Sequence, residues 1–423
     1  MAASPDRSPR ALLRQLFDAA VAAAHPKVCV PPHLPAPPEK GRTIVVGAGK
    51  AAAAMARAVE DHWRGPLSGL VVTRDGYGAP CLKIEVIEAA HPVPDERGRA
   101  AAGRMLELVR AAKPDDLVLC PMSGGASALL VLPAPGVALA DKQATTRALL
   151  KSGATIHEIN CVRKHLSAIK GGRLAAASPA RMLTLAISDV VGDDPSVIGS
   201  GPTVPDPSTF ADARAILAKY AIEPAPAVRA HLEAAADESP KPGDPRLARA
   251  EYRLVASPKD ALAAAAAKAQ ALGIEPIVLG ESVEGEARAV GAEHAAMARK
   301  LAADSSCAKP FVILSGGELT VTIEGRGSGG PSTEYLLGMA LALKGARGIH
   351  ALAADTDGID GSEDNAGAFV GPNTLARARD YTLDPAGCLD ANDAYSFFRA
   401  LGDLLLSGPT FTNVNDFRAI LIQ

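Results

Sequence analysis

The sequence predicts a two-domain α/β protein with mostly parallel sheets. Its 423 residues exceed what one ordinary hydrophobic core organises. Hydrophobic residues make up 48% of the chain, which is enough to fill large cores. Short apolar runs alternate with helical stretches along almost the whole sequence, a pattern typical of βα repeats around a sheet buried on both faces. We expect residues 1–245 to form a Rossmann-like domain and residues 246–423 to form a second α/β domain.

The expected strands fall into two series. The first series is Thr43–Val46, Leu70–Thr73, Ile84–Glu88, Asp116–Pro121 and Met182–Ser188. The second series is Tyr252–Ala256, Glu275–Leu279, Phe311–Leu314, Leu319–Ile323 and His350–Ala354. Residues 236–249 are rich in proline and mixed charges, so they are the predicted linker and place the boundary near residue 245. Residues 11–24 have apolar side chains at helical spacing and are expected to form an amphipathic docking helix.

The composition excludes several classes of function. A net charge of −3 and a pI near 6.3 argue against an electrostatic nucleic-acid binder. The uncharged run from Leu117 to Ala140 is broken by Pro121, Pro133 and Pro135, so we expect a buried strand and a loop rather than a membrane span. The six cysteines form no close pair of the zinc-finger or disulfide type, which predicts reduced thiols in a cytoplasmic protein. We expect a small-molecule substrate and leave open whether the protein forms a homodimer.

Glycine, serine and acidic residues follow five of the predicted strands. These loops are residues 47–50 (Gly-Ala-Gly-Lys), 123–127 (Ser-Gly-Gly-Ala-Ser), 188–193 (Ser-Asp-Val-Val-Gly-Asp), 315–318 (Ser-Gly-Gly-Glu) and 355–358 (Asp-Thr-Asp-Gly). The carboxyl ends of parallel strands meet at one edge of a sheet, where α/β proteins bind ligands. Glycine lets a phosphate approach the backbone, serine donates hydrogen bonds, and carboxylates hold Mg²⁺. The sequence therefore predicts a ligand site at this edge.

The first of these loops allows two interpretations. Gly47-x-Gly49-x-x-Ala52, with Asp75 about twenty residues later, loosely matches the dinucleotide-binding fingerprint and favours a dehydrogenase. Lys50 within the same turn instead suits a phosphate or carboxylate ligand. The chain has no G-x-x-x-x-G-K-[ST] motif, which excludes a P-loop nucleoside triphosphatase.

A cluster of basic residues follows an apolar helical stripe in the middle of the first domain. Its members are Arg163, Lys164, Lys170, Arg173 and the nearby Arg181. No acidic residue occurs between Glu158 and Asp189, whereas a solvated helix face usually intersperses acids among its bases. The pattern predicts a clamp for an anion or a phosphate.

Two groups of carboxylates are candidates for a cation. Asp189 and Asp193 lie four residues apart on one loop, a spacing that suits a hydrated metal ion. Asp355-x-Asp357-x-x-Asp360 superficially matches a calcium loop but lacks the glutamate at position twelve, so a Mg²⁺-nucleotide role is the favoured interpretation.

Taken in order, these motifs resemble the MOFRL-type glycerate 2-kinases. In the N-terminal half the matching stretches are residues 47–51, His91-Pro92-Val93-Pro94-Asp95, 123–127, Lys164-His165-Leu166-Ser167 with 170–172, 188–193 and Gly199-Ser200-Gly201-Pro202-Thr203. In the C-terminal half they are 314–318, 355–361 and Thr412-Asn413-Val414-Asn415-Asp416. The resemblance covers the chain from about residue 10 to the end, with the MOFRL region at about residues 310–418.

The resemblance implies a two-domain enzyme with its site in the interdomain cleft, which phosphorylates the 2-hydroxyl of (R)-glycerate with ATP and Mg²⁺. On this basis Lys50 and Asp189 are the expected catalytic residues. Substrate or phosphate binding is expected from Ser123, Gly124, Gly125, Ser127, Arg163, Lys164, Lys170 and Arg173; nucleotide binding from Ser315, Gly316, Gly317, Asp357 and Asn415; and metal binding from Asp189, Asp193 and Glu318. The alternative is an NAD(P)-dependent hydroxypyruvate reductase, a label often attached to such sequences.

Two positions depart from the pattern of the family. Pro331-Ser332-Thr333-Glu334 stands where Arg-Asn-x-Glu is common, which removes a cation that could serve a phosphate. Arg163 and Arg173 are the candidates to replace that cation. Phe411 stands where glycine is frequent.

Overall fold

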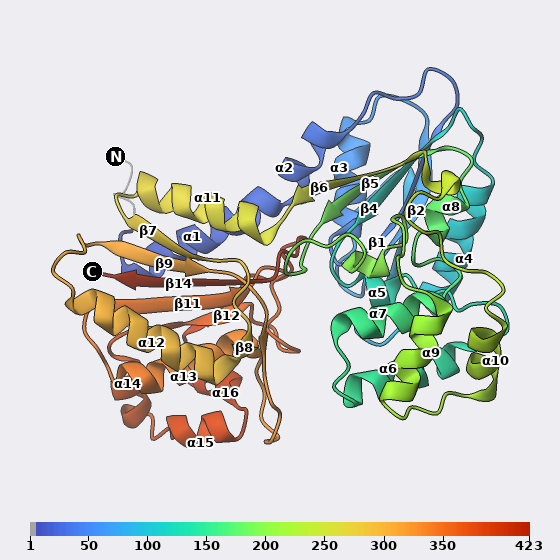
Figure 1. The fold of residues 1–423 in the computed structure, drawn as a ribbon. Helices are drawn as coiled ribbons and strands as arrows, with labels where there is room; N and C mark the ends of the chain where they lie inside the picture. The colour runs from blue at the N-terminus through green and yellow to red at the C-terminus, as the bar shows by residue number, and fades with distance from the viewer. Residues whose placement is uncertain (1–5) are drawn as a thin grey trace. The chain divides into compact units, whose positions relative to one another are not determined.

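The computed structural model describes residues 6–423 and divides them into two compact units (Figure 1). The N-terminal unit is Pro26–Val255, and the C-terminal unit combines the chain up to His25 with Ala256–Gln423. Among the described residues, no helix is both long enough and apolar enough to cross a bilayer.

The N-terminal unit is built on a six-stranded sheet in the order β3-β2-β1-β4-β5-β6. Its strands are β1 (Thr43–Ala48), β2 (Leu67–Arg74), β3 (Ile84–Ala89), β4 (Leu117–Met122), β5 (Arg181–Ile187) and β6 (Ala250–Ala256). The β1–β2, β2–β3, β1–β4 and β4–β5 pairs are parallel. This is the strand order of a doubly wound Rossmann-type sheet, so the predicted α/β class and the Rossmann-like first domain are confirmed.

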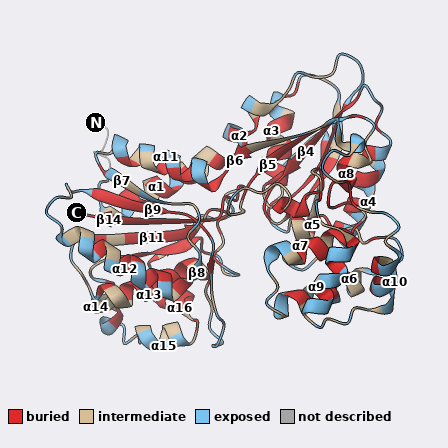
Figure 2. Ribbon diagram, viewed as in Figure 1, coloured by how far each residue is buried: buried red, intermediate tan, exposed pale blue. Residues whose placement is uncertain are grey.

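The central strands of this sheet are buried along their whole length because helices cover both faces (Figure 2). The helices of the unit are α2 (Pro26–Cys29), α3 (Ala52–His62), α4 (Glu96–Arg110), α5 (Ala126–Leu129), α6 (Leu139–Lys151), α7 (Ile156–His165), α8 (Arg173–Ala176), α9 (Phe210–Lys219) and α10 (Pro226–Ala234). Three short 3₁₀ segments lie at Pro31–His33, Ile198–Ser200 and Pro245–Leu247.

Helices α6, α7, α9 and α10 form a small helical layer with a core of its own (Figure 1). Leu149, Val162, Phe210, Leu217 and Leu232 are among the side chains that fill this core. Because α6 and α7 pack here, their opposite faces are available to line the pocket described below.

The C-terminal unit contains a second six-stranded sheet in the order β13-β12-β11-β14-β9-β7. Its strands are β7 (Glu275–Gly280), β9 (Phe311–Ser315), β11 (Ile349–Asp355), β12 (Gly367–Val370), β13 (Leu404–Leu405) and β14 (Asp416–Ile422), and β8 (Gly285–Glu286) pairs separately with β10 (Leu319–Thr320). The helices are α1 (Pro9–Ala24), α11 (Pro258–Ala271), α12 (Ala287–Ala303), α13 (Pro331–Leu343), α14 (Thr374–Asp380), α15 (Pro385–Asp390) and α16 (Ala394–Leu401).

The second sheet differs from the mostly parallel sheet that the sequence predicts. Only β7 and β9 pair in parallel, whereas the β11–β12, β11–β14, β12–β13 and β9–β14 pairs are antiparallel. The cause is the pairing of β11 with β12, which returns beside it after a loop, and the insertion of the C-terminal strand β14 between β11 and β9. Strands β12, β13 and β14 are absent from the predicted series.

The division of the chain also differs from the expected boundary near residue 245. Strand β6 joins the first sheet, and the predicted linker is held in the N-terminal unit, where Asp237 pairs with Arg173 at 3.0 Å. Helix α1 belongs to the C-terminal unit because its apolar face packs there, with the Phe17 and Phe417 rings 6.0 Å apart.

Candidate functional site

The turn after β1 and the loop after β4 are bonded to each other. The Lys50 N–H donates to the Gly124 carbonyl at 2.8 Å, and the Ala51 N–H donates to the Ser123 hydroxyl at 2.9 Å. Gly49 has φ +137°, and a Cβ there would lie 2.2 Å from Ser123 Oγ, so only glycine fits this close approach. Ser123 is fully buried. Its hydroxyl and the Gly124 carbonyl therefore hold the two loops together, which differs from the predicted phosphate cradle.

Four successive backbone N–H groups of the same turn, those of residues 49–52, already donate to acceptors within the protein. The Gly49 N–H donates to the Val72 carbonyl at 3.1 Å, and the Ala52 N–H donates to the Gly49 carbonyl at 3.1 Å. With Lys50 and Ala51 bonded as above, all four successive N–H groups are satisfied within the protein. Asp75, the expected ribose partner of a dinucleotide, instead forms a two-fold ion pair with Arg97 at 2.7 and 2.8 Å. The geometry therefore argues against the dinucleotide interpretation of this turn.

Lys50 lies beside a pocket in the N-terminal unit. Gly125, in the left-handed conformation at φ +81°, connects the two: a Cβ at Gly125 would lie 3.2 Å from Lys50 Cγ and 3.1 Å from His91 Nε2. Gly125 and His91 are both in the wall of the pocket. Lys50 is half-buried at the border of this cavity.

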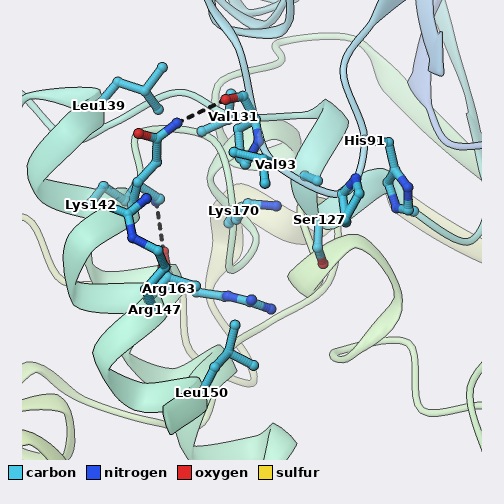
Figure 3. Close-up of a pocket in the computed structure, with 16 residues that line it drawn as sticks. His91, Val93, Ser127, Val131, Leu139, Lys142, Arg147, Leu150, Arg163 and Lys170 are labelled. Carbon is cyan, nitrogen blue, oxygen red and sulfur yellow. Dashed lines mark hydrogen bonds between the residues drawn. The ribbon is translucent and has the colours of Figure 1, made fainter. Parts of the chain in front are cut away.

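The pocket has a volume of about 280 Å³ and a basic lining without any acid (Figure 3). Its basic side chains are Lys142 and Arg147 from α6, Arg163 from α7, and Lys170 from the segment that follows α7. The uncharged polar members are Ser127, Gln143 and Thr146, and the apolar members include Val93, Val131, Leu139 and Leu150. Neither aspartate nor glutamate occurs among the lining residues, so the pocket suits an anion.

Two of these lysines are buried and bonded to backbone carbonyls. Lys142 Nζ donates to the Arg163 carbonyl at 3.0 Å and to the Leu166 carbonyl at 2.7 Å, and Lys170 Nζ donates to the Gly199 carbonyl at 2.9 Å. Burial, reinforced by the charges of Arg163 and Arg173, lowers the pKa of Lys142 to about 7. Burial also lowers the pKa of Lys170 well below its usual value, with Lys142 the next contributor.

Arg163 is the basic residue best placed to meet a ligand. Within residues 6–423 its guanidinium forms no hydrogen bond or ion pair, and burial lowers its pKa. Nearby, Ser127 Oγ lies 3.0 Å from Ser200 Oγ, which donates to Asn160 Oδ1 at 3.1 Å. The pocket therefore combines a guanidinium without a protein partner with a fixed hydroxyl.

The remaining members of the predicted basic clamp have carboxylate partners of their own. Lys164 Nζ lies 3.4 Å from buried Asp206, and Arg173 Nη1 lies 3.0 Å from Asp237. Arg181 pairs on the surface with Glu251 at 2.8 Å. The structure thus brings Arg163 and Lys170 into the pocket and places Lys164 and Arg173 in neutralised pairs elsewhere.

Sequence reasoning missed the contribution of α6. Its pocket residues are Leu139, Lys142, Gln143, Thr146, Arg147 and Leu150. They recur at i, i+3, i+4, i+7, i+8 and i+11, which defines one face of a helix. This helical spacing of basic and apolar residues could have identified the pocket-lining face of α6 from the sequence.

The loop after β5 carries the candidate metal ligands. Asp193 has φ +55°, and its Oδ1 atom is buried without a hydrogen-bond partner in the part of the chain that the structure describes. Asp194 is engaged by Ser196, whose N–H donates to it at 2.8 Å. Burial first, and then the negative charges of Asp193, Asp194 and Asp189, raise the pKa of Tyr252.

These carboxylates fit Mg²⁺ better than a metal that needs a closed protein cage. Mg²⁺ is commonly held by one or two carboxylates together with substrate phosphates and water. Over residues 6–423 no group of three or more His, Cys, Asp or Glu side chains is close enough to form a complete site. Asp189 and the unpartnered oxygen of Asp193 therefore meet the requirement for Mg²⁺, and their role as ligands stays a prediction.

In the C-terminal unit, the predicted nucleotide loop is engaged by its own chain. The Gly316 N–H donates to the Gly280 carbonyl at 2.9 Å, and Arg418 donates to the Gly316 carbonyl and, at 3.4 Å, to Ser315 Oγ. Gly317 has φ +110°, and a Cβ there would lie 2.3 Å from the Val283 carbonyl. The polar groups of residues 315–317 are thus largely used in packing this loop.

The acidic loop after β11 stabilises its own turns. Asp357 is buried and accepts from the Ile359 N–H at 2.8 Å, while the Asn415 carbonyl accepts from Thr356 Oγ1 at 2.7 Å. Asp360 accepts from the Ser332 and Thr333 N–H groups at 2.9 and 2.8 Å, at the start of α13. Burial raises the pKa of Asp360 to about 7.

Three further positions can now be placed. Glu318 is exposed in the loop between β9 and β10. Pro331 is the first residue of α13, where its missing N–H removes no helical hydrogen bond. Phe411 has φ +59°, in the left-handed region that favours glycine, which agrees with the glycine frequent at this position in the resembled family.

The two units and the acid-free basic pocket define a two-domain α/β protein with a site suited to an anionic ligand. The family model described as "Domain of unknown function (DUF4147)" matches residues 12–233, and that of the MOFRL family matches residues 311–416. The chain is 42% identical to glycerate 2-kinase of Pyrococcus horikoshii, over 89% of this chain and 86% of that protein. It is 55% identical to an Agrobacterium vitis protein named "Putative hydroxypyruvate reductase", over 99% and 95% of the two chains.

A solved structure gives the same relationship. The crystal structure of glycerate kinase from Thermotoga maritima matches with a TM-score of 0.86 and 38% identity, over 97% of this chain and 99% of that one. The chain belongs to the MOFRL-type glycerate 2-kinase family, which confirms the resemblance.

Proposed function

We propose that this protein phosphorylates the 2-hydroxyl of (R)-glycerate with ATP and Mg²⁺ and releases 2-phosphoglycerate. The observation that carries the proposal is the pocket of four basic residues without an acid, bordered by Lys50. Relatives named glycerate 2-kinase and D-glycerate 2-kinase, at 42% and 41% identity, support the substrate and the position of transfer.

Phosphoryl transfer requires positioning and charge neutralisation more than covalent chemistry from the protein. Lys50 is the fixed ammonium that would stabilise the charge of the transferring group, because Gly125 allows its side chain to lie at the border of the pocket. Arg163 has no protein partner within residues 6–423, so its guanidinium is available to bind a carboxylate or phosphate in two-fold geometry.

Asp189 and Asp193 are the residues that would hold Mg²⁺ in the N-terminal unit. The buried Oδ1 of Asp193, which lacks a hydrogen-bond partner among the described residues, supports this role. When bound, the ion supplies neutralisation of charge on the phosphate oxygens. Participation of Glu318, a cytoplasmic location and a homodimer stay predictions.

The decisive experiment incubates the purified protein with D-glycerate, ATP and Mg²⁺ and identifies the product by ³¹P NMR. We expect 2-phosphoglycerate, which depends on Mg²⁺ and is absent with heat-inactivated protein. Formation of 3-phosphoglycerate would refute the assigned position of transfer. Absence of any phosphoglycerate would refute the kinase.

A parallel assay with hydroxypyruvate and NADH or NADPH tests the reductase named for the Agrobacterium vitis relative. We expect no cofactor oxidation above the heat-inactivated control, because all four N–H groups of the glycine turn are bonded within the protein. Oxidation that an Asp75→Ala change abolishes would support the reductase instead.

A further inference from the structure

The apolar half of the basic pocket is not explained by glycerate. Each of the three carbons of glycerate carries oxygen, so the molecule offers little apolar surface. The pocket nevertheless includes Val93, Val131, Leu139 and Leu150. Val93 and Leu150 are 60% and 58% exposed, although large apolar side chains gain about 25 cal/mol per Å² when they are covered. These walls indicate a ligand with an apolar face.

The charge of the pocket also exceeds what glycerate needs. Arg147 and Arg163 carry lasting positive charges and no acid lines the pocket, whereas glycerate carries one negative charge. A nucleoside triphosphate carries several negative charges at one end and a flat, largely apolar base at the other. That molecule matches both halves of the lining.

The polar groups are distributed in the way such a ligand requires. Arg163 and Lys170 lie near Ser127 at one end of the pocket, toward His91 and the border where Lys50 lies (Figure 3). On the α6 side, Gln143 Nε2 donates to the Pro94 carbonyl at 2.8 Å, which fixes the amide and leaves its oxygen available to accept from a base.

The loop predicted to bind the nucleotide in the C-terminal unit offers fewer groups. Its Gly316 N–H and carbonyl are bonded to Gly280 and Arg418, and its Ser315 hydroxyl accepts from Arg418. A phosphate there would have to displace bonds that the fold already makes. The pocket of the N-terminal unit requires no such displacement at Arg163.

We propose that this pocket is the nucleotide site, with the base against Val93 and Leu139 and the phosphates on Arg163 and Lys170. The inference deepens the proposed kinase function and rests on it. It moves the nucleotide from residues 315–317 to the N-terminal unit, and it makes α6 the helix that selects the donor.

The test measures binding of the non-hydrolysable analogue β,γ-imido-ATP with Mg²⁺ to the full-length protein by isothermal titration calorimetry. Leu150→Asp and Val93→Asp each place a carboxylate at the mouth of the pocket, on side chains exposed enough for the fold to tolerate the change. We expect each variant to bind the analogue at least tenfold more weakly. Leu82→Asp, at a side chain that is 90% exposed and outside the pocket, is the matched control and should bind as the unmodified protein does.

Steady-state kinetics separate failure of this inference from failure of the kinase. If the unmodified protein phosphorylates glycerate while both pocket variants keep its KM for ATP and raise the KM for glycerate, the pocket is the glycerate site and the inference is wrong. Unchanged affinity of both variants for the analogue would overturn it equally. If the unmodified protein neither binds the analogue nor forms phosphoglycerate, the proposed function itself fails.

Discussion

Replacing Lys142 by methionine should change how the stability of the N-terminal unit depends on pH. Lys142 is buried, and its Nζ donates to the carbonyls of Arg163 and Leu166. A neutral amine still has two N–H donors, so deprotonation keeps both bonds while removing a buried charge from a pocket that contains other cations. The methionine side chain of Lys142→Met has a similar shape, but it has no hydrogen-bond donor and no ionisable group.

The magnitude follows from the difference between the folded and unfolded pKa values. Burial lowers the pKa of Lys142 from 10.5 to about 7 in the folded protein. Below pH 7 both states hold the proton; between pH 7 and 10.5 only the unfolded chain holds it, so unfolding takes up a proton and becomes less favourable as pH rises. At about 1.36 kcal/mol per pH unit, the free energy of unfolding should rise by ~2.7 kcal/mol between pH 6 and 9 relative to Lys142→Met.

Urea unfolding at pH 6, 7, 8 and 9 measures this difference in both proteins. Trp63 is the single tryptophan of the chain and is buried in the N-terminal unit, so its fluorescence reports the relevant unit. The methionine variant should lose most stability, relative to the unmodified protein, at pH 9. The Arg163 carbonyl then loses its Lys142 donor, at a cost of about 1–3 kcal/mol, while the Leu166 carbonyl keeps the Ala134 N–H. A difference in the free energy of unfolding between the two proteins that stays constant from pH 6 to 9 would refute the assignment of Lys142 as a buried, neutral amine.

Three further predictions concern the chemistry and the fold. Lys50→Ala should keep the melting temperature and lose about 10²–10³ in kcat, as for removal of one preorganised donor, and Lys50→Arg should recover little; kcat within tenfold of the unmodified enzyme would contradict its catalytic role. Asp193→Asn, and likewise Asp189→Asn, should raise the Mg²⁺ concentration for half-maximal activity, and unchanged Mg²⁺ titrations of both would remove them as ligands. Asp360→Ala should destabilise the C-terminal unit by about 2–4 kcal/mol, seen as a lower Tm by circular dichroism, because the Ser332 and Thr333 N–H groups lose their acceptor; an unchanged Tm would show that water replaces the carboxylate.

The sequence was sufficient to predict the strands of the first sheet but insufficient to predict all strands of the second sheet and their directions. Strands β1 to β5 are short apolar runs, separated by helices except between β2 and β3, where a loop connects them, so the local pattern is enough to find them. Strand β14 is completely buried, yet Asp416 and Arg418 interrupt its apolar pattern. Arg418 is 1% exposed because Asp416 and the Gly316 carbonyl accept its hydrogen bonds. The local residue pattern reveals neither the hydrogen bond to that distant carbonyl nor the antiparallel direction in which β14 inserts.

The basic clamp shows the same limit at the level of side chains. Arg163 and Lys164 are neighbours in sequence, but consecutive residues of a helix point about 100° apart. Only Arg163 lines the pocket, while Lys164 reaches Asp206, 42 residues later. Arg173 likewise meets Asp237, 64 residues later. A count of charges along the chain locates the anion site, but the distant acids decide which of the cations remain available to it.

The glycine turn after β1 helps to decide between the two activities named for relatives of this chain, those of a glycerate kinase and a hydroxypyruvate reductase. Its sequence matches a dinucleotide fingerprint, and the strand order around it is the one that binds dinucleotides. A pyrophosphate, however, binds such a turn through free backbone N–H groups. Here the N–H groups of residues 49–52 donate to Val72, Gly124, Ser123 and Gly49. What the turn still presents is the Lys50 side chain, beside the pocket through Gly125. A fixed positive charge at the border of a basic pocket can stabilise a transferring phosphoryl group, whereas hydride transfer to or from a nicotinamide does not require such a charge.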